Sequence, residues 1–183
     1  MKKLICGAFL AVFAASAAFA QSGSSVEKQV SHIRSLYSEA KEKISMMEEV
    51  GIPANDMTIT YNYMAPAIGQ VSSTDRVWYE LHDQETETSF KYYYYPIFAT
   101  RHYNITVRDV YEEYLYDTEN ECLVFFYYRE KWPEGGELIE DRYYWNEKGE
   151  LIRHIGTSPD NDHSAEAIGN RFVQQLDVMT IYL

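Results

Sequence analysis

The side chains that could act as an acid or a base are scattered along the chain and form no recognised catalytic motif. The histidines lack the HxxxH and HExxH spacings that place two zinc ligands on one helical face; they are His32, His82, His102, His154 and His163. Acid–base catalysis would need residues from separate strands, and the candidates are Glu80, Glu113, His102 and His154. A small hydrolase or isomerase built on such residues is one hypothesis.

Adjacent carboxylates do not improve that case. Glu112 and Glu113 are neighbours in one predicted strand, and Glu140 and Asp141 are neighbours in another. Because successive side chains of a strand point to opposite faces, neither pair can serve as the facing acid and base of a glycosidase. Such carboxyl groups lie about 5–9.5 Å apart across a cleft.

The sequence predicts neither a metal nor a cofactor. The run 160–162 begins like a calcium loop, but Ala165 stands where that loop needs glycine and Arg171 stands in place of its closing glutamate. The glycines never fall into GxGxxG or GxxxxGK[ST] order, which argues against a phosphate-binding loop. A GxSxG nucleophile elbow is also missing from the sequence.

Cys122 is the only cysteine after the first twenty residues. It begins the apolar run Cys122–Phe126, which favours a buried, unreactive thiol over a nucleophile. With a single cysteine, residues 21–183 cannot form an internal disulfide.

Residues 1–20 have the layout of a secretory signal peptide. Lys2 and Lys3 precede the apolar stretch 4–19, and residues 18–20 form a small-x-small cleavage site. The apolar stretch is shorter than the roughly 20 residues that span a bilayer. We therefore predict cleavage after Ala20, rather than a buried helix or a retained anchor. The product is expected to be secreted or periplasmic, without stable membrane insertion.

Composition and charge exclude several classes of protein. The chain of 183 residues has 16 Lys plus Arg against 28 Asp plus Glu, a net charge of -12. Loss of Lys2 and Lys3 with the signal peptide lowers this charge by two, to -14. Such a balance disfavours nucleic acid and anionic membrane surfaces as partners. With 46% hydrophobic residues, residues 21–183 are predicted to fold as one domain.

A long helix is predicted directly after the signal peptide. Its apolar residues follow at steps of four and three and therefore share one face: Val26, Val30, Ile33, Tyr37, Ala40, Ile44 and Met47. Ser24 and Glu27 form a capping box at its start, and the run 51–53 (Gly-Ile-Pro) ends it. We expect the stripe to pack on a sheet; a coiled-coil dimer is the alternative.

After Pro53 the hydrophobic period changes to two, which predicts strands. They cover Met57–Tyr63, Arg76–His82, Phe90–Tyr95, Ile105–Tyr116, Cys122–Lys131, Leu138–Trp145 and Leu151–Ile155. Short polar connectors with turn residues join the later strands, at residues 117–120, 133–136 and 146–149, which predicts antiparallel hairpins rather than a parallel sheet.

A short C-terminal helix is predicted over residues 164–176, because Ile168, Phe172 and Leu176 share one face. The predicted fold class is therefore α+β. A long N-terminal helix packs on a curved antiparallel meander of about seven strands, and the short helix closes the fold.

Tyrosine is unusually abundant, with 17 residues in the chain. Runs such as Tyr92–Tyr95 place aromatic rings on both faces of a sheet. One interpretation is sheet stabilisation, because tyrosine suits strands and pairs across them. The other is a recognition face. The candidate binding residues on such a face are Tyr92, Tyr94, Tyr127, Tyr144 and Trp145.

One resemblance bears on the setting of the protein. A signal peptide, a helix and a tyrosine-rich meander follow one another, and the meander contains the segments 140–145 (EDRYYW) and 149–153 (GELIR). In this organisation the chain resembles small exported proteins of the Bacteroidetes to which no activity is assigned. The resemblance implies a periplasmic or secreted location and nothing about chemistry.

The leading hypothesis is an exported, non-enzymatic domain that binds a glycan, a peptide or a protein through an aromatic face of its sheet. It rests on the tyrosine content together with the missing catalytic motifs. The hydrolase or isomerase described above is one alternative. A structural or assembly subunit that associates through the helical stripe is another.

Overall fold

The computed structural model describes residues 6–50, 55–85, 90–133, 136–157 and 165–180. Helix α1 spans Cys6–Val50 and helix α2 spans Ala165–Thr180. The strands between them are β1 (Asp56–Ala65), β2 (Gly69–Glu85), β3 (Phe90–Ile105), β4 (Arg108–Asp117), β5 (Cys122–Lys131), β6 (Leu138–Trp145) and β7 (Leu151–Ile155).

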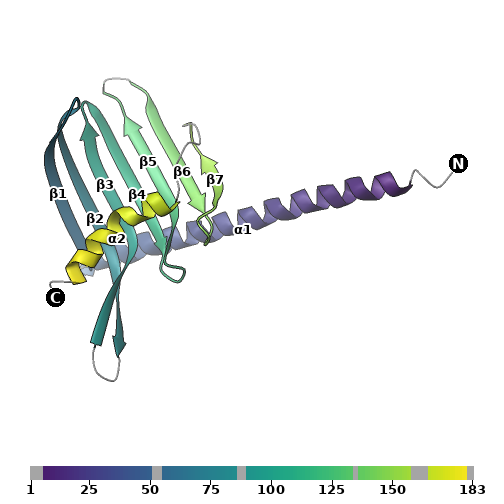
Figure 1. Ribbon diagram of the computed structural model, residues 1–183, viewed down its shortest axis with the longest axis horizontal. Helices are drawn as coiled ribbons and strands as arrows, with labels where there is room; N and C mark the ends of the chain where they lie inside the picture. Colours follow the sequence, from purple (N-terminus) through teal and green to yellow (C-terminus); the bar gives the residue numbers. More distant parts are fainter. Residues whose placement is uncertain (1–5, 51–54, 86–89, 134–135, 158–164, 181–183) are drawn as a thin grey trace.

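The seven strands form one sheet in the order β1-β2-β3-β4-β5-β6-β7, and every pair of neighbours is antiparallel. Helix α1 crosses one face of this sheet and α2 lies on the other (Figure 1). We refer to these as the α1 face and the α2 face. The arrangement confirms the predicted α+β fold: a long N-terminal helix, a seven-stranded meander and a short C-terminal helix.

The apolar stripe of α1 packs on the sheet, as its spacing predicts. Its buried members are Val30, Ile33, Ala40 and Ile44. Tyr37 lies edge-on to Phe98 of β3, with ring centroids 5.7 Å apart, and edge-on to Phe125 of β5 at 5.5 Å. Because the stripe is occupied by the sheet of the same chain, it does not present the open seam that a coiled coil needs.

The start of α1 differs from the prediction. The helix begins at Cys6 and continues through Ser24, so the predicted capping-box start at Ser24 and Glu27 is wrong for the chain of residues 1–183. Residues 6–50 contain no proline, so no residue in this stretch removes a backbone donor from the helix. Among the described residues, no helix combines the length and the apolar character needed to cross a membrane.

Helix α2 covers the opposite face of the sheet with the three residues that its spacing predicts. Ile168, Phe172 and Leu176 are 3%, 0% and 2% exposed. Gly169 lets the helix approach β5 closely, because a Cβ there would lie 3.2 Å from the Cβ of Leu123. The Tyr116 hydroxyl donates a hydrogen bond to the Gly169 carbonyl at 2.9 Å. Hydrophobic contact and a buried hydrogen bond therefore both hold α2 to the sheet.

The boundary between β3 and β4 also differs from the prediction. Ile105 ends β3, and β4 begins at Arg108, so the predicted single strand Ile105–Tyr116 is wrong at its start. The reversal places Thr106 in the left-handed region, with φ of 57°.

Strand β3 contains a proline in its interior. β3 accommodates Pro96 because Pro96 lies beside a register shift in the β2–β3 ladder, where regular hydrogen bonding is interrupted.

Candidate functional site

The aromatic residues predicted to bind a ligand do not share one surface. Tyr144 is 4% exposed in the core beneath α1, whereas Trp145 is 1% exposed in the core beneath α2. Tyr127 is partly buried on the α1 face, and Tyr94 packs against the core of the α2 face. Tyr92 lies in β3, but its side chain is outside the described residues. Because each face carries a helix, Tyr144 and Trp145 are core residues, and their side chains offer almost no surface to a ligand.

Tyrosine hydroxyls on both faces donate to strand carboxylates, which gives many tyrosines a structural role. On the α1 face Tyr37 and Tyr111 donate to Glu113 at 2.8 and 2.9 Å. On the α2 face Tyr128 donates to Glu130 at 2.6 Å. Burial, together with these carboxylates, raises the pKa of each tyrosine above its ordinary value. The abundance of tyrosine is therefore explained in part by polar contacts within the fold.

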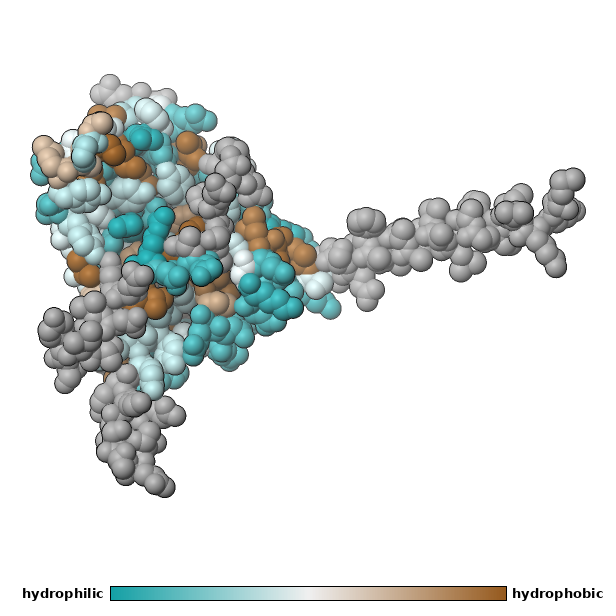
Figure 2. Space-filling view, in the orientation of Figure 1, coloured by the Kyte–Doolittle hydropathy of each residue, from teal (hydrophilic) through white to brown (hydrophobic). Residues whose placement is uncertain are grey.

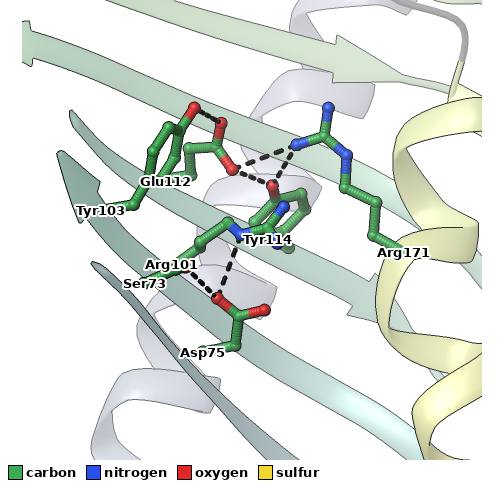
Figure 3. Close-up of polar contacts among 7 residues, drawn as sticks. All are labelled: Ser73, Asp75, Arg101, Tyr103, Glu112, Tyr114 and Arg171. Carbon is green, nitrogen blue, oxygen red and sulfur yellow. Dashed lines mark hydrogen bonds and ion pairs between the residues drawn. The ribbon is translucent and has the colours of Figure 1, made fainter. Parts of the chain in front are cut away.

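Glu112 is the centre of a polar network beside α2 (Figure 3). Its carboxylate is 3% exposed and accepts hydrogen bonds from the hydroxyls of Tyr114 and Tyr103, the latter at 3.0 Å. Arg171 of α2 lies 3.1 Å from Glu112 Oε2 and donates to the Tyr114 hydroxyl at 2.8 Å. The neighbouring Glu113 faces α1, which confirms that this adjacent pair diverges. The network joins α2 to β3 and β4 through a nearly buried charge.

Asp75 lies on the same face of the sheet, on β2. Its Oδ1 atom accepts hydrogen bonds from Ser73 Oγ at 2.9 Å and from Arg101 Nε at 3.0 Å (Figure 3). Its Oδ2 atom is buried and has no hydrogen-bond partner among the described residues. A buried acceptor without a donor costs roughly 1–3 kcal/mol of stability. Asp75 is 1% exposed, so its carboxylate is shielded rather than presented to a ligand.

An open pocket of about 590 Å³ lies at the end of the sheet where β5 leads into β6. Its walls, which define the Trp132 pocket, are Arg108, Glu130, Trp132, Pro133, Gly136, Glu137 and Ile139. The indole side chain of Trp132 is 41% exposed. The guanidinium carbon of Arg108 lies 5.1 Å from the centroid of that ring, and its Nη1 is 3.0 Å from Glu130 Oε1. The indole ring of Trp132 and the ion pair of Arg108 with Glu130 therefore lie side by side.

Glu130 is held as a carboxylate in this pocket. Tyr128 donates to its Oε2 at 2.6 Å and Arg108 donates to its Oε1 at 3.0 Å. Burial by itself raises the pKa of Glu130, but these hydrogen bonds and the Arg108 charge outweigh burial and leave the pKa below its ordinary value. The pocket thus offers an indole ring and a cationic donor whose position the Glu130 carboxylate fixes.

Exposed apolar side chains gather at the same end of the sheet. In an antiparallel meander the β1–β2, β3–β4 and β5–β6 connections all lie at one end. These connections and the strand ends next to them carry Met64, Ile68, Val107 and Leu138, which are 75%, 41%, 66% and 54% exposed. Figure 2 shows apolar patches at the upper end of the sheet, above α2. Grouped exposed apolar residues are typical of contact surfaces.

The four acid–base candidates are not brought together. Glu80 pairs with Lys43 of α1, and Glu113 is occupied by tyrosine hydroxyls. The Nε2 atom of His102 lies 2.5 Å from Asp109 Oδ1 on the exposed part of the α1 face. The remaining candidate, His154, lies on the α2 face. The sheet therefore separates His154 from the other three.

His154 is packed rather than open. Its Nε2 lies 2.8 Å from Asp141 Oδ1, and its ring stacks on Tyr143 with centroids 4.4 Å apart. The backbone of Gly156 approaches the same carboxylate closely, because a Cβ at this position would lie 1.9 Å from Asp141 Oδ1. Asp141 and Glu140 diverge to opposite faces, as predicted for strand neighbours, since Glu140 accepts from Tyr127 on the α1 face.

Two further sequence predictions concern the thiol and the metal. Cys122 is a free, half-buried thiol, and burial together with Asp117 and Glu147 raises its pKa, which disfavours a reactive thiolate. Within the described ranges no group of three or more potential metal ligands is present. The calcium-like run 160–162 and His163 lie outside the described residues.

The Trp132 pocket was not predicted from the sequence. Trp132 follows a strand and precedes Pro133 in a polar connector, and a tryptophan at such a position is the signal that could have indicated the pocket.

Comparison with known proteins identifies no relative of this chain. No protein-family model matches the chain, and no curated protein or solved structure is significantly similar to it.

Proposed function

We propose that this protein is an exported, non-enzymatic binding domain and that it holds a glycan in the Trp132 pocket. The observation that carries the proposal is the exposed indole ring of Trp132 beside the paired Arg108 and Glu130. Export rests on the signal-peptide layout of residues 1–20 and on the resemblance to exported proteins of the Bacteroidetes.

The chemistry of the pocket favours a sugar over a peptide. A sugar ring has an apolar C–H face, which packs on an indole ring, and an edge of hydroxyl groups that both donate and accept hydrogen bonds. Arg108 supplies a guanidinium donor at that edge, and its hydrogen bond to the buried Glu130 carboxylate fixes its position. The side chains of Pro133 and Ile139 add apolar wall. Ligand pockets commonly combine such an apolar lining with a few fixed polar groups.

The contacts of the titratable groups argue against an enzyme. Glu113 and Glu130 are both tied up by tyrosine hydroxyls and cations of the fold, and the pKa of Glu130 is lowered rather than raised. A general acid at neutral pH needs a raised carboxyl pKa and access to substrate. The pocket is better suited to holding a ligand than to transferring its protons.

The test is isothermal titration with a panel of oligosaccharides from the bacterial cell envelope. We expect binding to at least one of them and a loss of about tenfold or more in affinity for Trp132→Ala, which is about 1.4 kcal/mol. The matched control is Tyr63→Ala, since Tyr63 is 54% exposed near the same end of the sheet but does not line the pocket. Absence of binding across the panel, or equal affinity of Trp132→Ala and the native chain, would refute the proposal.

A further inference from the structure

Strand β1 is an edge of the sheet whose outer main-chain groups can be identified. β1 pairs with β2 over ten residue pairs, and no described strand pairs with its other side. The Tyr79 amide donates to the Asn55 carbonyl at 2.9 Å, which marks that opposed pair as hydrogen-bonded. Because such pairs alternate in an antiparallel ladder, odd-numbered residues of β1 bond to β2. The amides and carbonyls that point outward belong to Asp56, Thr58, Thr60, Asn62 and Met64.

This edge lacks the features that usually prevent strands from pairing. β1 contains no proline, lysine or arginine, and its register with β2 runs without a bulge from Asp56 to Ala65. Thr58, Thr60, Asn62 and Met64 are all exposed. The opposite edge, β7, is only five residues long and carries Arg153 and His154. Of the two edges, β1 is therefore the one open to another strand.

The sequence of β1 is complementary to itself in an antiparallel pairing. A two-fold axis at Thr60 places Thr60 opposite its own copy, Thr58 opposite Asn62, and Asp56 opposite Met64. All of these are outward-pointing residues, so the ladder can form in this register.

The same two-fold axis also pairs the apolar side chains of the two β1 strands. It places Met57 opposite Tyr63, and Ile59 opposite Tyr61, so an aliphatic residue meets an aromatic one at each position. These residues lie on the α2 face, because their partners in β2 include Val77 and Asp75. The exposed polar residues Thr58 and Asn62 meet on the other face. On the α2 face this register places no apolar residue opposite a charge, and on the other face Asp56 meets Met64.

We infer that β1 binds the β1 strand of a second copy of this chain, making a continuous fourteen-stranded sheet around a two-fold axis at Thr60. The charges of β1 are compatible with this occupant, and the side-chain pairs set out above support it. Asp56 is the only charged residue of β1, it is 2.7 Å from Arg76, and the axis keeps the two copies of Asp56 at opposite ends of the paired strands. A protein with a net charge of -12 can therefore pair with itself here without opposing like charges in the ladder. In Figure 1 the N-terminal part of α1 extends past β7, at the edge opposite to β1, so this part of the helix does not cover the β1 edge.

The first test is the mass, measured by light scattering, of the purified protein expressed from a gene for residues 1–183. We expect twice the chain mass for the native protein and for Thr60→Ala, which keeps the amide. Thr60→Pro removes an outward amide that β2 does not use, and we expect it to halve the mass with the circular dichroism spectrum unchanged. A monomeric native protein would overturn the inference, and so would a Thr60→Pro protein that remains a dimer.

A charge exchange tests the register and does not depend on proline. Thr58→Lys with Asn62→Lys places lysine opposite lysine at two positions, and we expect a monomer. Thr58→Glu with Asn62→Lys places opposite charges at those positions, and we expect a dimer. Both variants alter exposed side chains, so the fold is retained. Equal masses for the two variants would overturn the pairing at Thr60.

Discussion

Alkaline pH should unfold this protein, because its buried tyrosines are held in the neutral form. Burial is the main reason that the pKa values of Tyr114 and Tyr116 lie well above the ordinary value of a tyrosine, and the charge of Glu112 adds to it for Tyr114. A group whose pKa is raised by folding gives its full stabilisation below its unfolded pKa, which is about 10 for tyrosine. That stabilisation is lost as the pH rises toward the folded pKa.

The size of the effect follows from linkage. For each tyrosine whose folded pKa lies far above 10, the free energy of unfolding falls by about 1.4 kcal/mol at pH 11 and about 2.7 kcal/mol at pH 12. Tyr114 and Tyr116, which are 0% and 7% exposed, together give losses of about 3 and about 5 kcal/mol at these pH values. Half-buried tyrosines such as Tyr37 and Tyr103 add smaller losses, because solvent screens them. Since domains are typically stable by about 5–15 kcal/mol, unfolding is expected near pH 12.

The assay follows circular dichroism and tyrosinate absorbance together during an alkaline titration. We expect the buried tyrosines to ionise in the same cooperative step in which the secondary structure is lost. Tyr116→Phe removes one ionising group and should reduce the slope of unfolding free energy against pH by about 1.4 kcal/mol per pH unit. The control Phe172→Leu destabilises the same core without a titratable group, so its slope should equal that of the native protein. Gradual ionisation of every tyrosine near pH 10 with the fold intact would refute the reasoning.

Three further outcomes are expected. Ile33→Ala should lower the free energy of unfolding by about 2–5 kcal/mol in urea titrations, whereas Ser35→Ala on the exposed side of α1 should change it little; equal effects would contradict the packing of the stripe. Glu112→Gln should lower the free energy of unfolding by about 1.5–3 kcal/mol, because it removes a buried charge that faces Arg171 and two hydroxyl donors. An unchanged free energy of unfolding would contradict the network. In a secreting bacterial host, the exported product should begin at Gln21 by intact mass; a product that retains residues 1–20 in the cytoplasm would refute export.

The elements could largely be predicted because their periodicity is strong. Ile33 in α1 and Phe172 in α2 are buried where a period of 3.6 places them, and the strands follow a period of two. The boundary at Ile105 was missed because a two-residue reversal leaves little compositional trace, and its two residues, Thr106 and Val107, are types that suit strands. The helical start was missed because a capping motif describes a helix end only when the chain before it is not helical.

The candidate site could not be predicted, since it depends on tertiary placement. Alternation places the neighbours Tyr144 and Trp145 on opposite faces of the sheet, but it does not show that each face is covered by a helix. The Trp132 pocket needs Arg108 from the start of β4 to lie beside Glu130 near the end of β5, which follows from strand register. Register depends on side-chain packing and turn geometry over the whole sheet, and a single sequence does not determine it locally.

The order of strands in the sheet has a consequence for how the chain reaches its native state. Every strand pairs with its neighbour in sequence, so the sheet can grow hairpin by hairpin, with little loop-closure entropy at each step. Helix α1 differs, because Glu27 meets Arg153 of β7 across a separation of 126 residues. Its apolar stripe has no complete surface to cover until β3, β4 and β5 have assembled. Helix α1 is synthesised before the sheet but is packed only after β3, β4 and β5 have formed. During that interval the stripe around Ile33 is an apolar surface that a chaperone would shield.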